Sequence, residues 1–381
     1  MTAPPAGTAP GAAPGAPVLA RATAVPAAPL RDQFGRSIEY LRISVTDRCN
    51  FRGVYCMPAA GLPWLPRPDI LTYEEIAALV GELAPLGLRR LRLTGGEPTI
   101  RRDLPALVRL LRAVLGIEDI ALSTNGVRLP ALAGALRDAG LDRVNMSVDS
   151  LRPSRIAAIA RRDLGFDPLV AARAATAAGL DPLKLNVVVI RGVNDDEIGE
   201  LARLTREQPW HVRFIELMPV GELAESLGDE FGGPPPHTTG PTGVVDPLAR
   251  VVPSEEVLAR AADALGGLVR VAAGGGGGPG GAPRGNGPAE YYRGAGAAGT
   301  VGVITPMTHT YCASCNRVRL TADGRLRTCL YGDHEVDLRT PLRAGAPLAP
   351  HLLAALAAKP REHALLERRT GGLRALSQVG G

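Results

Sequence analysis

The chain has 381 residues, enough for a barrel-sized domain with an appendage. Its 43 Lys and Arg against 38 Asp and Glu leave a formal charge of +5, too mild for a general nucleic-acid-binding protein. No long apolar stretch predicts a membrane span, and residues 1–29 form an Ala/Pro-rich segment without a signal-peptide core. We therefore expect a cytoplasmic protein with a disordered tail at 1–29 and no nucleic-acid or membrane partner.

From about residue 38, short β-rich runs alternate with longer amphipathic segments. The predicted strands are YLRISVT (40–46), RRLRLTG (89–95), IALSTN (120–125), RVNMSVD (143–149), LKLNVVVI (183–190) and VRFIELM (212–218). The predicted helices between them are 72–87, 102–116, 129–140, 165–179 and 195–207, with Thr72 and Asp195 as caps and Gly87, Gly140 and Gly179 as stops. Such alternation predicts a parallel sheet joined by right-handed crossovers. Six units are too few for an eight-fold barrel, so the expected fold is α/β, a partial (β/α)6 barrel over 30–219.

Four motifs follow predicted strands directly: TDRC, TGGEP, STNG and NMSVDS. Active sites of parallel α/β sheets lie at the carboxyl ends of the strands, so these motifs belong to one candidate site. In TGGEP (94–98), two glycines let the backbone approach a ligand. Exposed backbone groups and the Glu97 carboxylate could hold a zwitterion there. An ordinary strand-to-helix turn is the alternative interpretation.

The remaining region, 220–381, is less regular. Its composition predicts flexible insertions at 221–248 and 274–286. Between them, the pattern predicts a helix over PSEEVLARAADALGG. It also predicts a β-hairpin over VRLTADGRLRTC, with ADG at its turn. We expect this region to extend the barrel and to carry a second site.

The five cysteines are divided between the two ends of the folded region. An odd number in two clusters is a poor disulfide framework, and such clusters more often hold metal or do redox chemistry. Cys312 and Cys315 form a C-x2-C, and the hairpin returns Cys329 beside them. Three thiolates leave one metal position open. A structural zinc site, with His309 or His334 as the fourth ligand, and a set of reduced core cysteines both remain as alternatives.

Basic residues recur on or beside the predicted strands: Arg42, Arg90, Arg92, Lys184, Arg317 and Arg319. Alternation in RLRL and RVRL places both arginines of a pair on one face of the strand. Guanidinium groups suit phosphate oxygens and the edge of guanine. Because both pairs lie next to cysteine motifs, we expect an anionic substrate, with a solvated sheet edge as the alternative.

Together these motifs resemble the GTP 3′,8-cyclase family of radical S-adenosylmethionine (SAM) enzymes, lyases that begin molybdenum cofactor (molybdopterin) biosynthesis. The resemblance covers roughly 30–219 and 287–381. It is carried by LRISVTDRCNFR, YCMP, LTGGEP, RRDL, STNG, SVDS, RGVND, RFIELMP, CNRVRLTADGRLRTCL and the final Gly-Gly. It implies cyclisation of GTP to (8S)-3′,8-cyclo-7,8-dihydroguanosine 5′-triphosphate. The oxidant of the sugar is a 5′-deoxyadenosyl radical, released from SAM by one electron from a [4Fe–4S] cluster.

The same resemblance implies a role for each matching position. Cys49 and Cys56 would ligate a first cluster, and Cys312, Cys315 and Cys329 a second [4Fe–4S] cluster whose open iron meets guanine. The SAM-binding residues would be Tyr55, Gly96, Ser147 and Met218. The GTP-binding residues would be Arg42, Arg92, Ser123, Lys184, Arg317, Val318 and Arg319. It also implies a flavodoxin or ferredoxin as electron donor, a cyclic pyranopterin monophosphate synthase as the next enzyme, a homodimer, and a Gly-Gly tail inside the active site.

One position departs from the family pattern. Gly53 stands where the C-x3-C-x2-C motif of the first cluster has its middle cysteine. A cluster held by two thiolates would expose two irons and bind weakly. A small external ligand could complete it, the chain could be a paralogue without catalysis, or the glycine could be a recent single-base change. We therefore expect an impaired cyclase. The alternative is an inactive GTP-binding paralogue or dimer partner that retains the carboxy-terminal cluster.

Overall fold

The computed structural model describes residues 30–218, 247–272, 281–285, 287–363 and 374–380. The predicted tail at 1–29 lies outside the described residues, as do most of the predicted insertion at 221–248, residues 274–280 of the other insertion, and Gly381.

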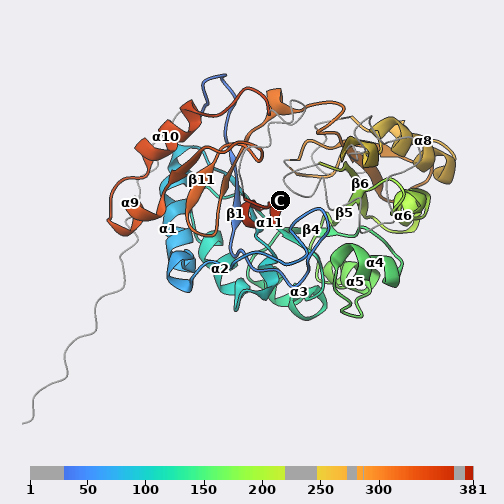
Figure 1. Cartoon of the computed structure of the whole chain (residues 1–381), viewed down its shortest axis with the longest axis horizontal. Helices are drawn as coiled ribbons and strands as arrows, with labels where there is room; N and C mark the ends of the chain where they lie inside the picture. Colours follow the sequence, from blue (N-terminus) through green and yellow to red (C-terminus); the bar gives the residue numbers. More distant parts are fainter. Residues whose placement is uncertain (1–29, 219–246, 273–280, 286, 364–373, 381) are drawn as a thin grey trace, which may run out of the picture.

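Six parallel strands form the frame of the molecule, in the order in which they occur along the chain (Figure 1). They are β1 (Tyr40–Ser44), β2 (Arg90–Thr94), β3 (Asp119–Thr124), β4 (Arg143–Ser147), β5 (Lys184–Val189) and β6 (His211–Glu216). Each coincides with a predicted strand to within two residues at its start. The α/β partial barrel expected from the sequence is therefore confirmed.

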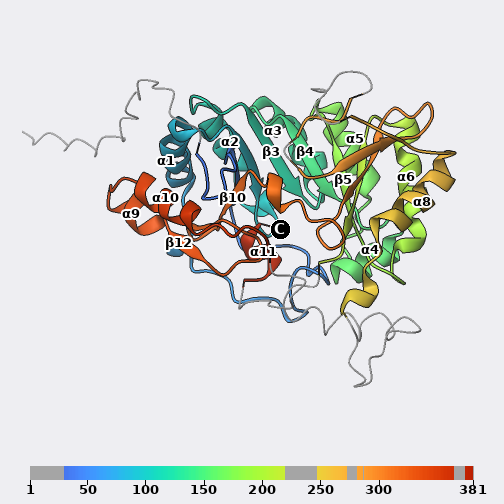
Figure 2. The same cartoon turned by 90° about the horizontal axis from the view of Figure 1, so that it is seen from above.

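Helices connect the strands and cover the outer face of the sheet (Figures 1 and 2). They are α1 (Tyr73–Leu83), α2 (Leu104–Arg112), α3 (Leu129–Asp138), α4 (Pro153–Ala160), α5 (Pro168–Ala177) and α6 (Ile198–Glu207). Thr72 caps α1 through a reciprocal capping box with Glu75, as predicted. The prediction for Asp195 is wrong, because α6 begins three residues later, with Glu197 at the cap position. Helix α4 was not predicted, since the sequence offers only a short pattern there.

The carboxy-terminal region joins both edges of the same sheet. Strand β9 (Thr300–Ile304) pairs in parallel with β6, and β10 (Arg317–Leu320) pairs in parallel with β1. The other strands are β7 (Val269–Arg270), β8 (Glu290–Arg293), β11 (Arg325–Arg327) and β12 (Glu335–Asp337). The sheet therefore has twelve strands, in the order β12-β11-β10-β1-β2-β3-β4-β5-β6-β9-β8-β7. The second region therefore extends the sheet at both of its edges.

The remaining helices lie outside the sheet, with one exception. Helices α8 (Ser254–Leu265), α9 (Arg339–Arg343) and α10 (Ala349–Ala357) pack on the outside, and α8 matches the predicted helix. The exception is α11 (Leu376–Val379), which both views place within the curve of the sheet (Figures 1 and 2). None of the described helices is long and apolar enough to cross a membrane.

Strand alternation separates the two faces of the sheet. Leu41, Leu91 and Leu122 are fully buried in a hydrophobic core that the helices cover. Their neighbours Arg42 and Arg92 point to the opposite side, into the barrel, because successive residues of a strand face opposite ways. The interior of the barrel is therefore polar and is available for a ligand.

Candidate active site

The loop that carries Cys49 is packed on the TGGEP turn. Gly96 N–H donates to the Thr46 carbonyl at 2.8 Å, and Glu97 N–H donates to the Arg48 carbonyl at 2.8 Å. A side chain at Gly96 would place its Cβ 2.2 Å from the Arg48 oxygen, and one at Gly95 would lie 2.5 Å from the Thr46 oxygen. The two glycines are therefore required so that the turn can support the cysteine loop closely.

Cys49 and Cys56 lie on the same wall of one cavity, with Gly53 between them. Cys56 N–H donates to the Gly53 carbonyl at 2.9 Å, and Phe51 N–H donates to the Cys49 sulfur at 3.4 Å. Burial raises the pKa of Cys49 to about 11. Burial, and then the charge on Cys49, raise that of Cys56 to about 12. The two thiols are thus close neighbours that stay protonated at neutral pH until a cation ionises them.

This amino-terminal cavity has a volume of about 190 Å³. Tyr55, Gly96, Ser123 and Ser147 line it beside the cysteines, from the loop and from the carboxyl ends of β2, β3 and β4. Three of the predicted SAM-binding residues are therefore brought together, along with Ser123, which was predicted to bind GTP.

Asp149 is a polar residue of this cavity that the sequence analysis did not single out, although it belongs to the NMSVDS motif. It lies just after β4 and accepts a hydrogen bond from the Tyr55 hydroxyl at 2.5 Å. Burial raises its pKa to about 6, against the hydrogen bonds from Tyr55 and the Val188 N–H. The signal that would have found it is its position directly after a strand, within an already noted motif.

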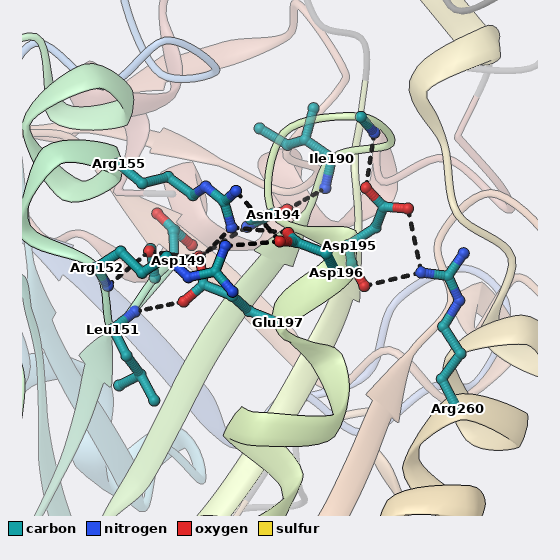
Figure 3. Close-up of polar contacts among 12 residues, drawn as sticks. Asp149, Leu151, Arg152, Arg155, Ile190, Asn194, Asp195, Asp196, Glu197 and Arg260 are labelled. Atoms are coloured by element: carbon teal, nitrogen blue, oxygen red, sulfur yellow. Dashed lines mark hydrogen bonds and ion pairs between the residues drawn. The ribbon is translucent and has the colours of Figure 1, made fainter.

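A polar network fixes this end of β4 (Figure 3). Asn194 donates to the Asp149 carbonyl at 2.8 Å and to the Val188 carbonyl at 2.9 Å. The buried Glu197 carboxylate accepts from the Ser150 hydroxyl at 2.7 Å and from the Leu151 N–H at 2.8 Å. The RGVND segment therefore positions the cavity wall without lining the cavity.

The expectation that the Glu97 carboxylate holds a zwitterion needs correction. Glu97 is buried, and it accepts from the Thr124 hydroxyl and the Asn125 N–H, each at 2.7 Å, as well as from Thr99. Its side chain therefore ties the end of β2 to the end of β3. What remains for a ligand at this turn is the glycine backbone.

A second cavity, which we term the basic cavity, occupies the centre of the barrel and measures about 180 Å³. Arg42, Arg92, Arg213 and Arg317 line it, together with Asn186, Tyr55, Ser123 and Ser147. No Asp or Glu is among the described residues that line it. Arg42 stands between Arg92 and Arg319 in the register of three adjacent strands. Like charges held side by side in a buried place repel one another, so a bound anion would be favourable there.

Lys184 lies at the base of this basic cluster and does not line the cavity itself. It is 1% exposed, and its ammonium donates to the Arg284 carbonyl. Burial, followed by repulsion from Arg213, Arg143 and Arg92, lowers its pKa well below the usual value. Such a cluster strongly favours a polyanion, because bound negative charge would relieve this repulsion.

Arg143 and Arg213 are members of the cluster that the sequence analysis missed. Arg143 is 1% exposed and pairs with Asp119, and Arg213 is 2% exposed and donates to Asn186 at 2.9 Å. Both lie on predicted strands, in RVNMSVD and VRFIELM. The signal that could have identified Arg143 and Arg213 was a charged residue inside an otherwise apolar predicted strand.

Two predicted residues lie elsewhere. The Val318 side chain is 2% exposed and belongs to the hydrophobic core, because it alternates with Arg317 and Arg319 along β10. Met218 was expected in the SAM pocket, and it lines the basic cavity beside Tyr331. Val318 could therefore contact a substrate only through its backbone.

The third cavity contains Cys312, Cys315 and Cys329, and we call it the carboxy-terminal cavity. Strands β10 and β11 form the predicted hairpin, which returns Cys329 to the first two cysteines. Burial raises the pKa of Cys315, but the charges of Lys359 and Arg317 outweigh that effect and lower it overall. Burial raises the pKa of Cys312. Arg319 also lines this cavity.

The histidines proposed as zinc ligands are not part of this cavity. His309 and His334 are exposed, and His363, which the sequence analysis did not consider, lines the cavity instead. Among the described residues, no three Cys, His, Asp or Glu side chains converge closely enough to hold a single metal ion.

The chain end enters the barrel between the two cysteine groups. The Arg319 guanidinium donates to the Gly380 carbonyl at 2.5 Å, and Gly380 lies against Thr94 at the end of β2. Arg374 pairs with Asp323 at 2.8 Å and anchors the segment that precedes α11. Helix α11 thereby contributes Leu376 and Ser377 to the wall of the amino-terminal cavity.

The three cavities adjoin one another and share lining residues. Tyr55, Ser123, Ser147 and Leu376 line both the amino-terminal and the basic cavity. Tyr311, Arg317 and Leu330 line both the basic and the carboxy-terminal cavity. The two cysteine groups therefore lie on the outer two of three adjoining cavities, with the arginines of the basic cavity between them.

Comparison with known proteins agrees with this architecture. Residues 43–205 match the Radical SAM superfamily, and residues 279–365 match Molybdenum Cofactor Synthesis C. A GTP 3′,8-cyclase of Moorella thermoacetica is 47% identical over 357 residues, covering 92% of this chain and 100% of that protein. The GTP 3′,8-cyclase of Heliobacterium modesticaldum is 47% identical over 358 residues, covering 92% and 99%. That of Pelotomaculum thermopropionicum is 45% identical over 355 residues, covering 92% and 100%. The chain belongs to the GTP 3′,8-cyclase family of the radical SAM superfamily.

Proposed function

We propose that this chain is a GTP 3′,8-cyclase that converts GTP to (8S)-3′,8-cyclo-7,8-dihydroguanosine 5′-triphosphate, the first step of molybdenum cofactor biosynthesis. We further propose that Gly53 impairs it. The observation that carries the proposal is the row of three adjoining cavities, with a cysteine group at each end and buried arginines between them. A nucleoside triphosphate has both the charge for the basic cavity and the base for the carboxy-terminal end.

The residues divide the work as follows. The triphosphate is bound by the arginines of the basic cavity: Arg42, Arg92 and Arg213. Lys184 adds positive charge from the base of the same cluster. Arg317 and Arg319 lie at the junction with the carboxy-terminal cavity, where they orient the guanine. Leu376 and Tyr55 narrow the passage between cavities and limit the access of water to the reacting sugar.

The donor sets of the two cysteine groups differ in how well they fit a [4Fe–4S] cluster. Cys312, Cys315 and Cys329 supply three thiols on one cavity and fit a cluster with one open iron. When bound, that cluster would supply a Lewis-acidic iron to the guanine. Cys49 and Cys56 supply two thiols, and Gly53 supplies none, so the first group does not fit a three-thiolate cluster. The electron and radical chemistry of the family therefore lacks its usual anchor in this chain.

The second candidate function is a GTP-binding protein without catalysis, acting as a paralogue or as the partner of an active subunit. Gly53 is the observation that favours it. The two candidates predict different iron contents. After anaerobic reconstitution, production of 5′-deoxyadenosine, with iron rising above about four and toward about eight per chain, supports the cyclase. About four irons and no 5′-deoxyadenosine support the non-catalytic protein.

The partners follow from the proposed reaction. A cyclase needs a low-potential electron donor such as a flavodoxin or ferredoxin. Its product would be consumed by a cyclic pyranopterin monophosphate synthase. We propose a homodimer as the functional unit. Co-purification and size-exclusion chromatography with GTP present would test that assembly.

A further inference from the structure

The chain uses lysine at two positions among its 43 basic residues, and arginine at all the others. Both lysines are buried: Lys184 is 1% exposed and Lys359 is 2% exposed. Lys184 belongs to the basic cluster described above. Lys359 follows α10, at the far end of the sequence, and has no role in the proposed function so far.

Lys359 points into the carboxy-terminal cavity, against the cysteines. Its ammonium donates to the Cys315 sulfur at 3.6 Å, to the Arg317 carbonyl at 3.1 Å and to the Thr328 carbonyl. An ammonium has three protons, so these three acceptors use all of them. Thr328 directly precedes Cys329, so one side chain joins the segments that carry two of the three cysteines.

The segment that carries Lys359 is itself held in place. Arg36 donates to the Pro360 carbonyl at 2.7 Å and to the Cys312 carbonyl at 2.9 Å. Arg36 in turn pairs with the buried carboxylate of Asp32 at 2.5 Å. The third cysteine segment is therefore linked to the lysine through Arg36. The position of the ammonium relative to all three cysteines is fixed by the fold.

The choice of lysine also has a chemical reason. A guanidinium is a flat fork with donors in one plane, whereas an ammonium is a compact charge whose three donors point in different directions. The three acceptors around Lys359 come from three separate chain positions, which suits the ammonium. A chain that places arginine almost everywhere else has kept lysine at this point.

We propose that Lys359 is a positioning residue for the second cluster: it holds the cysteine segments at their ligating separation and donates a charge-assisted hydrogen bond to the Cys315 ligand. The presence of that cluster rests on the proposed function. Hydrogen bonds to ligating sulfurs and nearby positive charge stabilise the more negative, reduced state of a cluster, so Lys359 raises its reduction potential. Without a cluster, Lys359 would serve only to satisfy two buried carbonyls.

The test uses the chain with Gly53 in place, because the incomplete first group leaves the second cluster as the main spectroscopic signal. We compare wild type with Lys359→Met, which keeps length and apolar volume, and with Lys359→Arg. The matched control is Arg361→Met, which removes a positive charge that lines the same cavity but is exposed to solvent, where its effect is screened. Iron and sulfide content, and the reduced fraction at a fixed applied potential, are measured after anaerobic reconstitution.

We expect the ratio of reduced to oxidised cluster to fall about tenfold in Lys359→Met, because the loss of one charge-assisted hydrogen bond changes an equilibrium by about that factor. Lys359→Arg should restore the charge but not the full iron content, and Arg361→Met should match wild type. An unchanged potential and unchanged iron content in Lys359→Met would overturn the role of the lysine. A wild type that binds no iron would instead overturn the second cluster, and with it the proposed function.

A measurement on the unmodified protein covers the case in which Lys359→Met fails to fold. In protein labelled with ¹⁵N-lysine, the reduced cluster should show coupling to a lysine nitrogen in electron–nuclear double resonance. Lys184→Arg leaves Lys359 as the one labelled side chain of the sequence, and the coupling should persist. Absence of any coupling in wild type would overturn the proposal.

Discussion

The two cysteine groups at the ends of the row of cavities differ in what surrounds them. In the amino-terminal group the thiols have raised pKa values, about 11 for Cys49 and about 12 for Cys56, chiefly through burial. In the carboxy-terminal group Lys359 and Arg317 lower the pKa of Cys315. The first group depends on an incoming cation to ionise its ligands, whereas the second has a cation built into the fold.

The comparison also shows that the amino-terminal group lacks one ligand but retains the rest of its site. Around Gly53 the supporting parts remain: the glycine pair under the loop, the Tyr55–Asp149 hydrogen bond and the network behind Asp149. A side chain is missing at one point in a wall that is otherwise built for a ligand. The four experiments below test this difference, from the largest expected effect to the smallest.

Gly53→Cys should raise 5′-deoxyadenosine formation by more than about 100-fold, because even partners outside the ligand shell change metal binding by 10–100-fold. A Cβ at residue 53 would lie 3.5 Å from the Cys56 Cβ, an ordinary contact, so the backbone leaves room for a Cβ at this position. Iron content and product are measured by anaerobic reconstitution and chromatography.

Gly53→Ser is the matched control, since it adds a side chain of similar size without sulfur. It should stay close to wild type. Equal, high activity in wild type and Gly53→Cys would show that the middle ligand is dispensable here and would remove the difference between the two groups.

In the metal-free protein, iodoacetamide should alkylate Cys315 at least about 30-fold faster than Cys56 at pH 7.5. The thiolate fraction falls tenfold per pKa unit, and the higher nucleophilicity of the more basic thiolate offsets about half of that. The rate at Cys315 should level off at a lower pH than the rates at Cys49 and Cys56, which should keep rising toward pH 11 and 12.

Peptide mass spectrometry over a pH series measures these rates residue by residue. Lys359→Met should slow alkylation of Cys315 and leave Cys56 unaffected. Similar rates at all the cysteines would contradict the proposed electrostatic difference.

Arg319→Ala should weaken GTP binding about tenfold, the worth of one charge-assisted hydrogen bond, and should leave iron content unchanged. Arg325→Ala on the same hairpin is the control, because its side chain is 40% exposed and pairs with Asp323 and Glu335. The thermal shift produced by GTP reports the affinity. Unchanged affinity in Arg319→Ala would remove this residue from the site.

Lys184→Met should have opposite effects on the free and the bound protein. Without GTP, the free energy of unfolding should rise by about 1 kcal/mol, because replacing a buried charge by an apolar side chain is often stabilising. The stabilisation gained from GTP should fall. Denaturant melts of wild type, Lys184→Met and Lys184→Arg measure both, and a destabilised free protein would show that Lys184 already has adequate partners.

The frame of the barrel could be predicted from the sequence because strand and helix periodicities differ clearly there. Each of the six central strands appears as a short β-rich run, and motifs such as TGGEP mark their carboxyl ends. Helix α4 was missed because eight residues beginning with proline carry little periodicity. The start of α6 was misplaced because acidic residues occupy three consecutive positions, 195–197, and any of them reads as a cap.

The candidate site was predicted less completely, for a reason that lies in tertiary structure. Glu97 was read as a ligand, but its oxygens meet donors from the next strand, which no local pattern reveals. Arg213 and Lys359 look like ordinary basic residues until the fold places one in the basic cavity and the other against Cys315. Val318 was included because it lies between two arginines, whereas strand alternation sends it into the core.

The pairing of β10 with β1 has a consequence for how the protein is made. Residues 40–43 lie beside residues 317–320, so the wall that carries Arg42 has no neighbour on that side until almost the whole chain has left the ribosome. Contacts so distant in sequence form late and slowly. Any fragment truncated before residue 317 would leave an unprotected parallel edge, and premature termination should therefore yield aggregation instead of a partly active enzyme.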